Sequence, residues 1–307
     1  MIIRIYQHIN IYIYTMKFAA ALLLFFAPII AFCQDNVAQH YKIYNTAKNS
    51  PATLDDVIND MAKADVLFFG EEHNDSTGHQ LEFILFQKLV EKYPAKVALT
   101  MEMFQTDCQV VLNEYLAGFI REKNLITEGR AWKNYKDYRP MVELAKTAHI
   151  PVIAANTPTR YTNMVTRVGL GGLQQLDTKA KEWLPPLPID TATGAYYEKF
   201  VAIMGGHSAM GALKVYQSQN LWDATMGYNI AQFYKANKGF KIFQVNGGFH
   251  SEEKLGTVAQ LQKYAPKVKI INVQAYADDS FENPDWTKYT KFGDYIIITD
   301  PKLPKTF

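Results

Sequence analysis

Histidine and glutamate side chains follow short apolar runs at separate points of the chain. Glu71, Glu72 and His73 follow VLFFG, Glu102 lies inside LTMEMF, and His250 closes VNGGFH. Imidazoles and carboxylates together can ligate Zn, Mn, Fe or Co, and an open coordination position would activate water for hydrolysis. These residue types predict a metal site of Glu71, His73, Glu102 and His250, with Glu71 or Glu72 as the catalytic base of a hydrolase.

Each of these residues also has a structural interpretation. Glu71 or Glu72 could be a solvated turn residue, and His73 alone could be a hydrogen-bonded turn residue. Glu102 is harder to explain in this way, because a buried carboxylate without a partner is costly. A histidine, an arginine or a metal ion would supply that partner.

Apolar runs and capping residues predict the elements that position these groups. We expect strands at 65–69, 97–103, 151–155, 241–245, 268–273 and 295–299, and helices at 78–93 and 110–120 and from Pro140 through Ala148. Strands that alternate with helices predict an α/β fold with a mostly parallel sheet and flanking helices. Ligands of such sheets bind beyond the carboxyl ends of the strands, where Asn156 and Arg160 also fall.

A long insertion, about residues 157–240, separates the third and fourth predicted strands. Helices near 196–204 and 209–235 make it a helical subdomain packed over the sheet, within a single α/β domain at 34–307. Its histidine, methionine and aromatic side chains suit either a core stripe or a slot for haem, a flat apolar ligand. The candidate haem-binding residues are His207, Met210, Tyr216, Trp222, Met226 and Tyr228.

Composition and missing motifs exclude several other classes of protein. The 307 residues are 48% hydrophobic, which excludes a disordered chain, and a formal charge of +2 without a basic cluster argues against nucleic-acid binding. The chain has no G-x-S-x-G nucleophile elbow, no phosphate-binding G-x-x-x-x-G-K-[ST] loop, and no G-x-G-x-x-G after a strand.

The first 33 residues predict an upstream extension followed by a signal peptide. Lys17 precedes an apolar run, and Ala31-x-Cys33 stands before Gln34, so ordinary cleavage leaves Gln34 first. An uncleaved membrane anchor is one alternative. Lipidation of Cys33 is another, although Phe32 fits a lipoprotein signal poorly. The expected location is the periplasm, or the outer membrane through a lipidated Cys33, and Cys108 remains as the one cysteine of the mature chain.

The ordered motifs resemble the ChaN family of haem-binding, iron-regulated proteins. They are FFGEEHNDSTGHQLE, VALTMEMF, WKNYKDYRPMVELAKTAHIPVIAANTP, GGHSAMG, QNLWDATM and VNGGFHSEEKLG, from Leu67 to Leu261. The resemblance extends to a wider superfamily of Tiki-type metalloproteases and erythromycin-esterase-like enzymes. The sequence differs from the family's pattern at Gly227, where alanine is common, and at Phe32.

The resemblance implies an exported haem-binding protein that acquires, stores or relays haem or iron. Its implied partners are haem, a second copy of the chain in a homodimer, and a haem receptor or transporter. The implied alternative is a metal-dependent hydrolase that uses the Glu/His cluster. Carried over residue by residue, the motifs mark as supporting residues Tyr138, Arg139, Asn156, Arg160 and Asp223, beside the metal and haem candidates already named.

Overall fold

The computed structural model describes residues 37–205 and 210–307, and no side chain of residues 210–212. The chain divides into two units, Met1–Tyr41 and Lys42–Phe307, and the second contains the site discussed below. The predicted extension and signal peptide at residues 1–33 lie outside the described residues. None of the described helices is both long and apolar enough to cross a bilayer.

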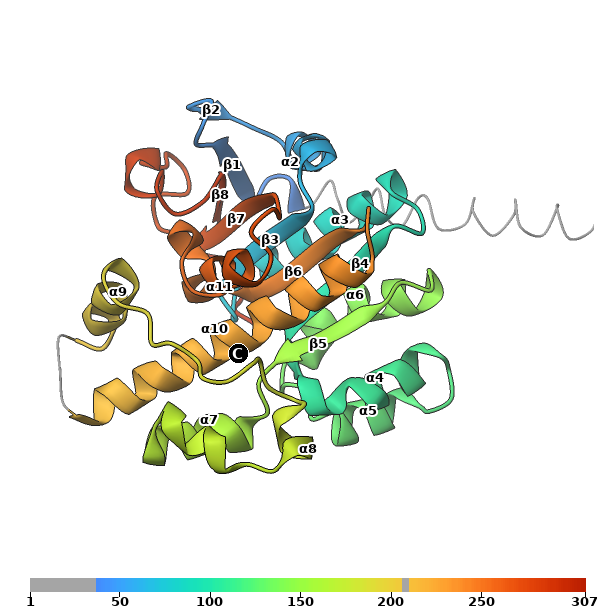
Figure 1. The fold of residues 1–307 in the computed structure, drawn as a ribbon. Coiled ribbons are helices and arrows are strands. Elements are labelled where there is room, and N and C mark those ends of the chain that lie inside the picture. The colour runs from blue at the N-terminus through green and yellow to red at the C-terminus, as the bar shows by residue number, and fades with distance from the viewer. Residues whose placement is uncertain (1–36, 206–209) are drawn as a thin grey trace, which may run out of the picture. The chain divides into compact units, whose positions relative to one another are not determined.

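A mixed, mostly parallel sheet organises the described part of the chain (Figure 1). Its order is β2-β1-β8-β7-β3-β6-β4-β5. The strands are β1 (Tyr41–Asn45), β2 (Ser50–Pro51), β3 (Val66–Glu71), β4 (Val97–Gln105), β5 (Val152–Asn156), β6 (Lys241–Gly247), β7 (Ile270–Ala277) and β8 (Tyr295–Thr299). Ladders from β8 through β5 are parallel, whereas β1 and β2 pair antiparallel. The predicted α/β class and the six predicted strands are therefore confirmed, within a few residues at their ends.

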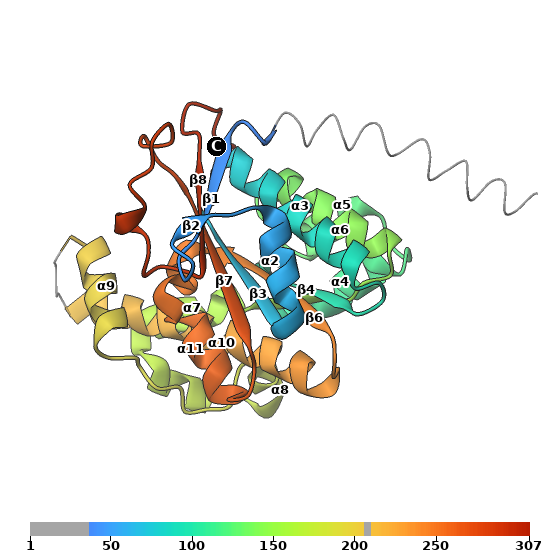
Figure 2. The same cartoon turned by 90° about the horizontal axis from the view of Figure 1, so that it is seen from above.

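Helices lie on both faces of the sheet. They are α2 (Leu54–Asp60), α3 (Ser76–Lys92), α4 (Gln109–Leu116), α5 (Glu122–Glu128), α6 (Tyr135–Thr147), α7 (Thr159–Val168), α8 (Thr178–Lys181), α9 (Ala195–Ile203), α10 (Met210–Ala236) and α11 (Thr257–Tyr264). Figure 2 shows α3 and α6 on one side of the strands and α10 and α11 on the other. The long helix α10, inside the predicted insertion, contributes Ile230 and Ala231 to the core against the sheet.

One predicted helix start differs from the structure. Helix α6 begins at Tyr135, so Pro140 lies inside it and not at its start. The reason is that Tyr135 and Tyr138 extend the buried face of α6 by more than a turn before the proline. After β4, helix α4 begins at Gln109, one residue from its predicted start, and ends at Leu116, before its predicted end at residue 120. Asp75 caps α3, because its side chain accepts a hydrogen bond from the Thr77 backbone N–H at 2.9 Å.

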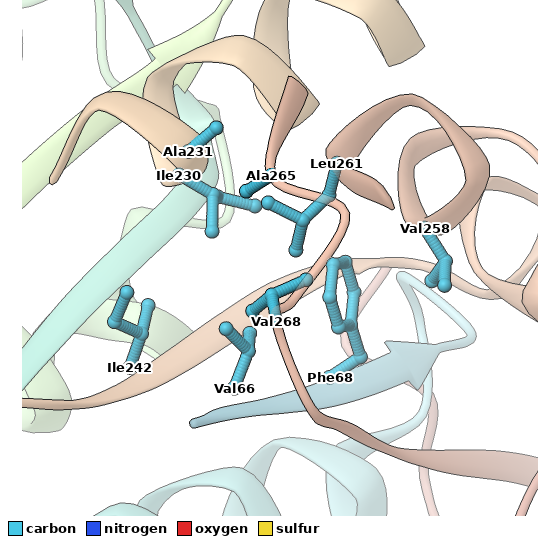
Figure 3. Close-up of a cluster of buried hydrophobic side chains, with 9 residues drawn as sticks. All are labelled: Val66, Phe68, Ile230, Ala231, Ile242, Val258, Leu261, Ala265 and Val268. Atoms are coloured by element: carbon cyan, nitrogen blue, oxygen red, sulfur yellow. The ribbon is translucent and has the colours of Figure 1, made fainter. Parts of the chain in front are cut away.

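Strand β3 is buried on both faces, and this fixes where its last residue points. Val66 and Phe68 pack with Ile230 of α10 and Leu261 of α11 (Figure 3). Side chains alternate along a strand, so Glu71 points to the opposite face, toward α3 and α6. The apolar packing of β3 thus places a carboxylate at the carboxyl end of a central strand.

Candidate functional site

A cavity of about 340 Å³ opens at the carboxyl ends of β3 and β6. Residues from both strand ends and from the insertion line it: Glu71, Glu72, His73, Phe200, Ile203, Gln219, Gly247, Gly248, Phe249 and His250. Phe200, Ile203 and Phe249 give one part of the wall an apolar character. The cavity therefore combines a carboxylate–imidazole end with an apolar side.

The Glu71 carboxylate holds the ring of His73. Its Oε1 atom lies 2.7 Å from His73 Nδ1 and accepts a 2.7 Å hydrogen bond from the Tyr138 hydroxyl. Burial opposes a charge on His73, but the Glu71 hydrogen bond and the charge of Glu102 outweigh it and raise the pKa of His73. The His73 side chain is 38% exposed, so its ring is accessible from the cavity.

Gly247 makes room beside the other ring nitrogen of His73. A Cβ atom at this position would lie 2.8 Å from His73 Nε2 and Cε1. The backbone N–H of Gly247 also donates a 2.8 Å hydrogen bond to Glu102 Oε2. Gly247 thereby satisfies a buried carboxylate and leaves Nε2 of His73 uncrowded.

Asp223 orients the second histidine of the cavity. His250 Nδ1 lies 2.7 Å from Asp223 Oδ1, and His250 Nε2 lies 3.6 Å from Glu102 Oε1. Asp223 also accepts hydrogen bonds from the Tyr196 hydroxyl at 2.5 Å and the Thr257 hydroxyl at 2.9 Å. Burial disfavours the charged imidazole, but Glu102 and Asp223 raise the pKa of His250 to about 9.

A second polar cluster lies behind the cavity wall, between β3 and α3. His79 Nδ1 is 2.9 Å from Glu71 Oε2 and 3.5 Å from Glu82 Oε2. Burial opposes the charge on His79, but the two carboxylates raise its pKa to about 11. Despite its burial, hydrogen bonds from His73 and His79 lower the pKa of Glu71, whereas burial and the Glu71 charge raise that of Glu82.

Some of the remaining predicted catalytic and supporting residues lie at the cavity, and others lie away from it. Glu72 lines the cavity, and burial raises its pKa. Tyr138 and Asp223 hold the cavity residues, as given above. Arg139 pairs with Glu122, and Arg160 with Asp107, away from the cavity lining. Asn156 closes β5 and accepts the Thr157 backbone N–H at 2.8 Å.

The predicted haem ligands of the insertion occupy several environments. His207 lies outside the described residues, as does the Met210 side chain. Tyr216 is buried and donates its hydroxyl to Ala192 O at 2.8 Å, and Met226 is buried with Sδ 3.8 Å from Gln244 Nε2. Trp222 meets the ring of His250 edge-on at 6.4 Å, and Tyr228 packs on Tyr264. Haem ligation by these residues stays a prediction.

His79, Glu82 and Gln219 belong to the site but were not predicted from the sequence. His79 and Glu82 stand three apart on one helix, and Gln219 stands four before Asp223, which are the spacings of side chains that share a helix face. These spacings could have identified the three residues from the sequence. Gln219 donates to the Tyr196 hydroxyl at 3.2 Å, and its Nε2 lies 3.0 Å from His250 Nδ1.

A larger cavity, about 690 Å³, lies near the start of α6 and the end of the chain. Its lining includes Arg130, Trp132, Lys133 and Lys136. The Trp132 ring packs edge-on against the His73 ring, with centroids 5.0 Å apart. Size alone does not make it the better candidate site, because the buried carboxylate–histidine pairs surround the smaller cavity.

Comparison with known proteins places the fold. The chain is similar to ChaN of Campylobacter jejuni, whose structure is described as showing cofacial haem binding, with 18% identity, a TM-score of 0.64, and coverage of 85% of this chain and 97% of that one. A Bacillus cereus protein matches with 11% identity, a TM-score of 0.48 and coverage of 87% and 97%. A mutant of the erythromycin esterase EreC matches with 10% identity, a TM-score of 0.46 and coverage of 85% and 83%.

No curated protein sequence matches the chain. A family model does match, from residue 57 to residue 261, and its description is haem-binding uptake, Tiki superfamily, ChaN. That range contains the cavity, the insertion, and two Gly-x-x-His motifs, Gly70–His73 and Gly247–His250. The chain therefore belongs to the ChaN family of haem-binding uptake proteins in the Tiki superfamily.

Proposed function

We propose that this protein binds haem and acts, after export, in the acquisition, storage or relay of haem or iron. Membership of the ChaN family is the observation that carries the proposal. The related ChaN of Campylobacter jejuni is described as binding haem cofacially. The cavity at the ends of β3 and β6 is where we expect the ligand.

The cavity suits haem because it joins an apolar wall to an imidazole. Haem binds in apolar slots in which a side chain such as histidine reaches the iron. Phe200, Ile203 and Phe249 would contact the porphyrin. Ile203 is 66% exposed, so the apolar surface continues outside the cavity and could cover a ligand larger than about 340 Å³.

His73 is the side chain that we assign to the iron at this site. Its Nδ1 is held by Glu71, and its Nε2 faces the space left by Gly247. A carboxylate on one ring nitrogen fixes the tautomer and strengthens the other nitrogen as a ligand, as in other metal-binding histidines. His207, at a position outside the described residues, is the alternative ligand from the sequence.

A haemin titration of the purified mature protein tests the proposal. We expect a saturable shift of the Soret band and a change in the spectrum of His73→Asn. The matched control is His149→Asn, since His149 is exposed and distant in sequence from both motifs. A wild-type protein without a saturable Soret shift would exclude haem binding. Light scattering with and without haemin tests the expected homodimer.

Export is part of the same proposal and has its own test. The basic residue, apolar run and Ala31-x-Cys33 of the leader support it. Mass spectrometry of the protein from its native cell envelope should give Gln34 as the first residue. A diacylated Cys33 would show a lipoprotein attached to a membrane, and an intact residue 1–33 segment would contradict cleavage.

A metal-dependent hydrolase is the second candidate function. The observation that favours it is His250, which lines the cavity, is oriented by Asp223, and lies beside Glu102. With His73, these groups could hold a divalent metal, and Glu71 or Glu72 could act as a base toward a bound water. Peptide or ester hydrolysis that needs added metal and is lost in His250→Ala would establish it. Equal background rates in wild type and variant would exclude it.

A further inference from the structure

Ligand-type atoms of three buried residues converge behind the cavity. Glu71 ends β3, and His79 and Glu82 share one face of α3. One ligating atom of each lies within 4.8 Å of the others. This set differs from the one predicted at the strand ends, with which it shares only Glu71.

The two distances from His79 to the carboxylates are those between ligands of one metal ion. His79 Nδ1 is 2.9 Å from Glu71 Oε2 and 3.5 Å from Glu82 Oε2. Bonds of about 2.0–2.2 Å to nitrogen and oxygen put neighbouring ligand atoms roughly 3.0–3.5 Å apart in octahedral and tetrahedral sites. An ion would therefore need only small side-chain movements.

The backbone orients the imidazole for such a role. His79 Nε2 lies 3.1 Å from the carbonyl oxygen of His73 and can donate a hydrogen bond to it. That bond directs Nδ1 toward the two carboxylates. Metal-ligating histidines regularly donate their other ring N–H to a carbonyl or a carboxylate, which fixes the ring and its tautomer.

One oxygen of the cluster, Glu82 Oε1, is buried without a hydrogen-bond partner, in a side chain that is fully buried. Buried polar atoms are nearly always satisfied, so this oxygen needs a partner. A divalent cation would take Glu82 Oε1 as a fourth ligand and would balance the charges of the two carboxylates.

We propose that Glu71, His79 and Glu82 form a buried site for one divalent transition-metal ion, of the Zn²⁺ or Mn²⁺ class. One imidazole and two carboxylates suit these ions. The ion would tie α3 to the end of β3 and hold Glu71, which in turn positions His73. The site does not depend on haem binding or on hydrolysis.

Metal analysis of the full-length and mature chains tests the site. The proteins are expressed with Zn²⁺ or Mn²⁺ in the medium and purified without a chelator. We expect one equivalent of metal in the wild type and an affinity at least roughly 100-fold lower in Glu82→Gln and His79→Gln. Glu91→Gln, the same change on the exposed face of α3, is the matched control and should keep the metal.

The remaining outcomes separate this site from the cavity. His250→Ala should retain the ion, because His250 is not one of its ligands. A wild-type chain without metal, or metal retained in Glu82→Gln, would overturn the proposal and leave a hydrogen-bonded cluster only. If the variants do not fold, anomalous scattering from wild-type crystals locates the ion, and an ion anywhere else also overturns it.

Discussion

Nδ1 of His73 lies 2.7 Å from Oε1 of Glu71, and this pair sets the direction in which the imidazole faces the cavity. Glu71 ends a fully buried strand, whereas the His73 side chain is 38% exposed. A rigid buried carboxylate thus orients an accessible imidazole. The opposite ring nitrogen stays uncrowded because residue 247 has no side chain.

Gly247→Ala should weaken haemin binding at least tenfold. Its Cβ would come within 2.8 Å of His73 Nε2 and Cε1, so the ring would have to move away from its position. The measurement is the haemin dissociation constant from Soret titrations. Gly171→Ala is the control, because nothing lies within 4 Å of a Cβ at that position. Equal affinity in the two variants would show that His73 Nε2 does not bind the iron.

The charged form of His250 should stabilise the fold at neutral pH and lose this effect at alkaline pH. Its pKa is raised to about 9, so its contribution is complete below the unfolded value of about 6.5 and is lost as pH rises through 9. The free energy of unfolding should fall by up to about 3 kcal/mol over that window. Deprotonation of His79 should lower the free energy of unfolding further as the pH approaches its pKa of about 11.

Urea titrations of wild type and His250→Gln between pH 6 and pH 9.5 measure this contribution. The variant should show the smaller decline with pH. The control is His149→Gln, in which an exposed histidine is replaced and the wild-type decline should remain. Parallel pH profiles for wild type and His250→Gln would refute the contribution of His250.

Tyr138→Phe should destabilise the protein by about 1–3 kcal/mol, because it removes a hydrogen bond to a buried charged carboxylate. The Tyr138 hydroxyl donates to Glu71 Oε1 at 2.7 Å. Thermal and urea unfolding measure the effect. Tyr234→Phe removes a hydroxyl from a half-buried ring of α10 and should change stability by less than about 0.5 kcal/mol. The hydrogen bond would be unimportant if both variants unfolded alike.

Gly227→Ala should destabilise the chain, although alanine favours helices by about 1 kcal/mol. A Cβ at residue 227 of α10 would lie 2.7 Å from the backbone nitrogen of Leu261 and 2.8 Å from Gln260 Cβ in α11. Overpacking of this kind costs about 1–3 kcal/mol. Urea unfolding measures it, and a variant more stable than wild type would show that the two helices can separate without cost.

The sequence by itself determined the architecture and the edge of the sheet where polar residues meet. The apolar runs VLFFG and KIFQV form buried strands. Parallel strands bring their carboxyl ends to the same edge of the sheet. The positions of His73 and His250 at the ends of predicted strands therefore placed both at the edge where the cavity lies. The predicted start of a helix at Pro140 was wrong, because the buried face of α6 begins before the proline.

Only the tertiary structure decided which groups pair. Glu71 and His73 are neighbours in sequence, but Asp223 and His250 meet only because α10 packs across the end of β6. His79 and Glu82 lie on the face of α3 that points to Glu71. The pattern of apolar residues in the sequence does not reveal that the end of β3 packs against this face. These pairs join side chains of different elements, and side-chain packing sets their distances after local preferences have fixed the elements.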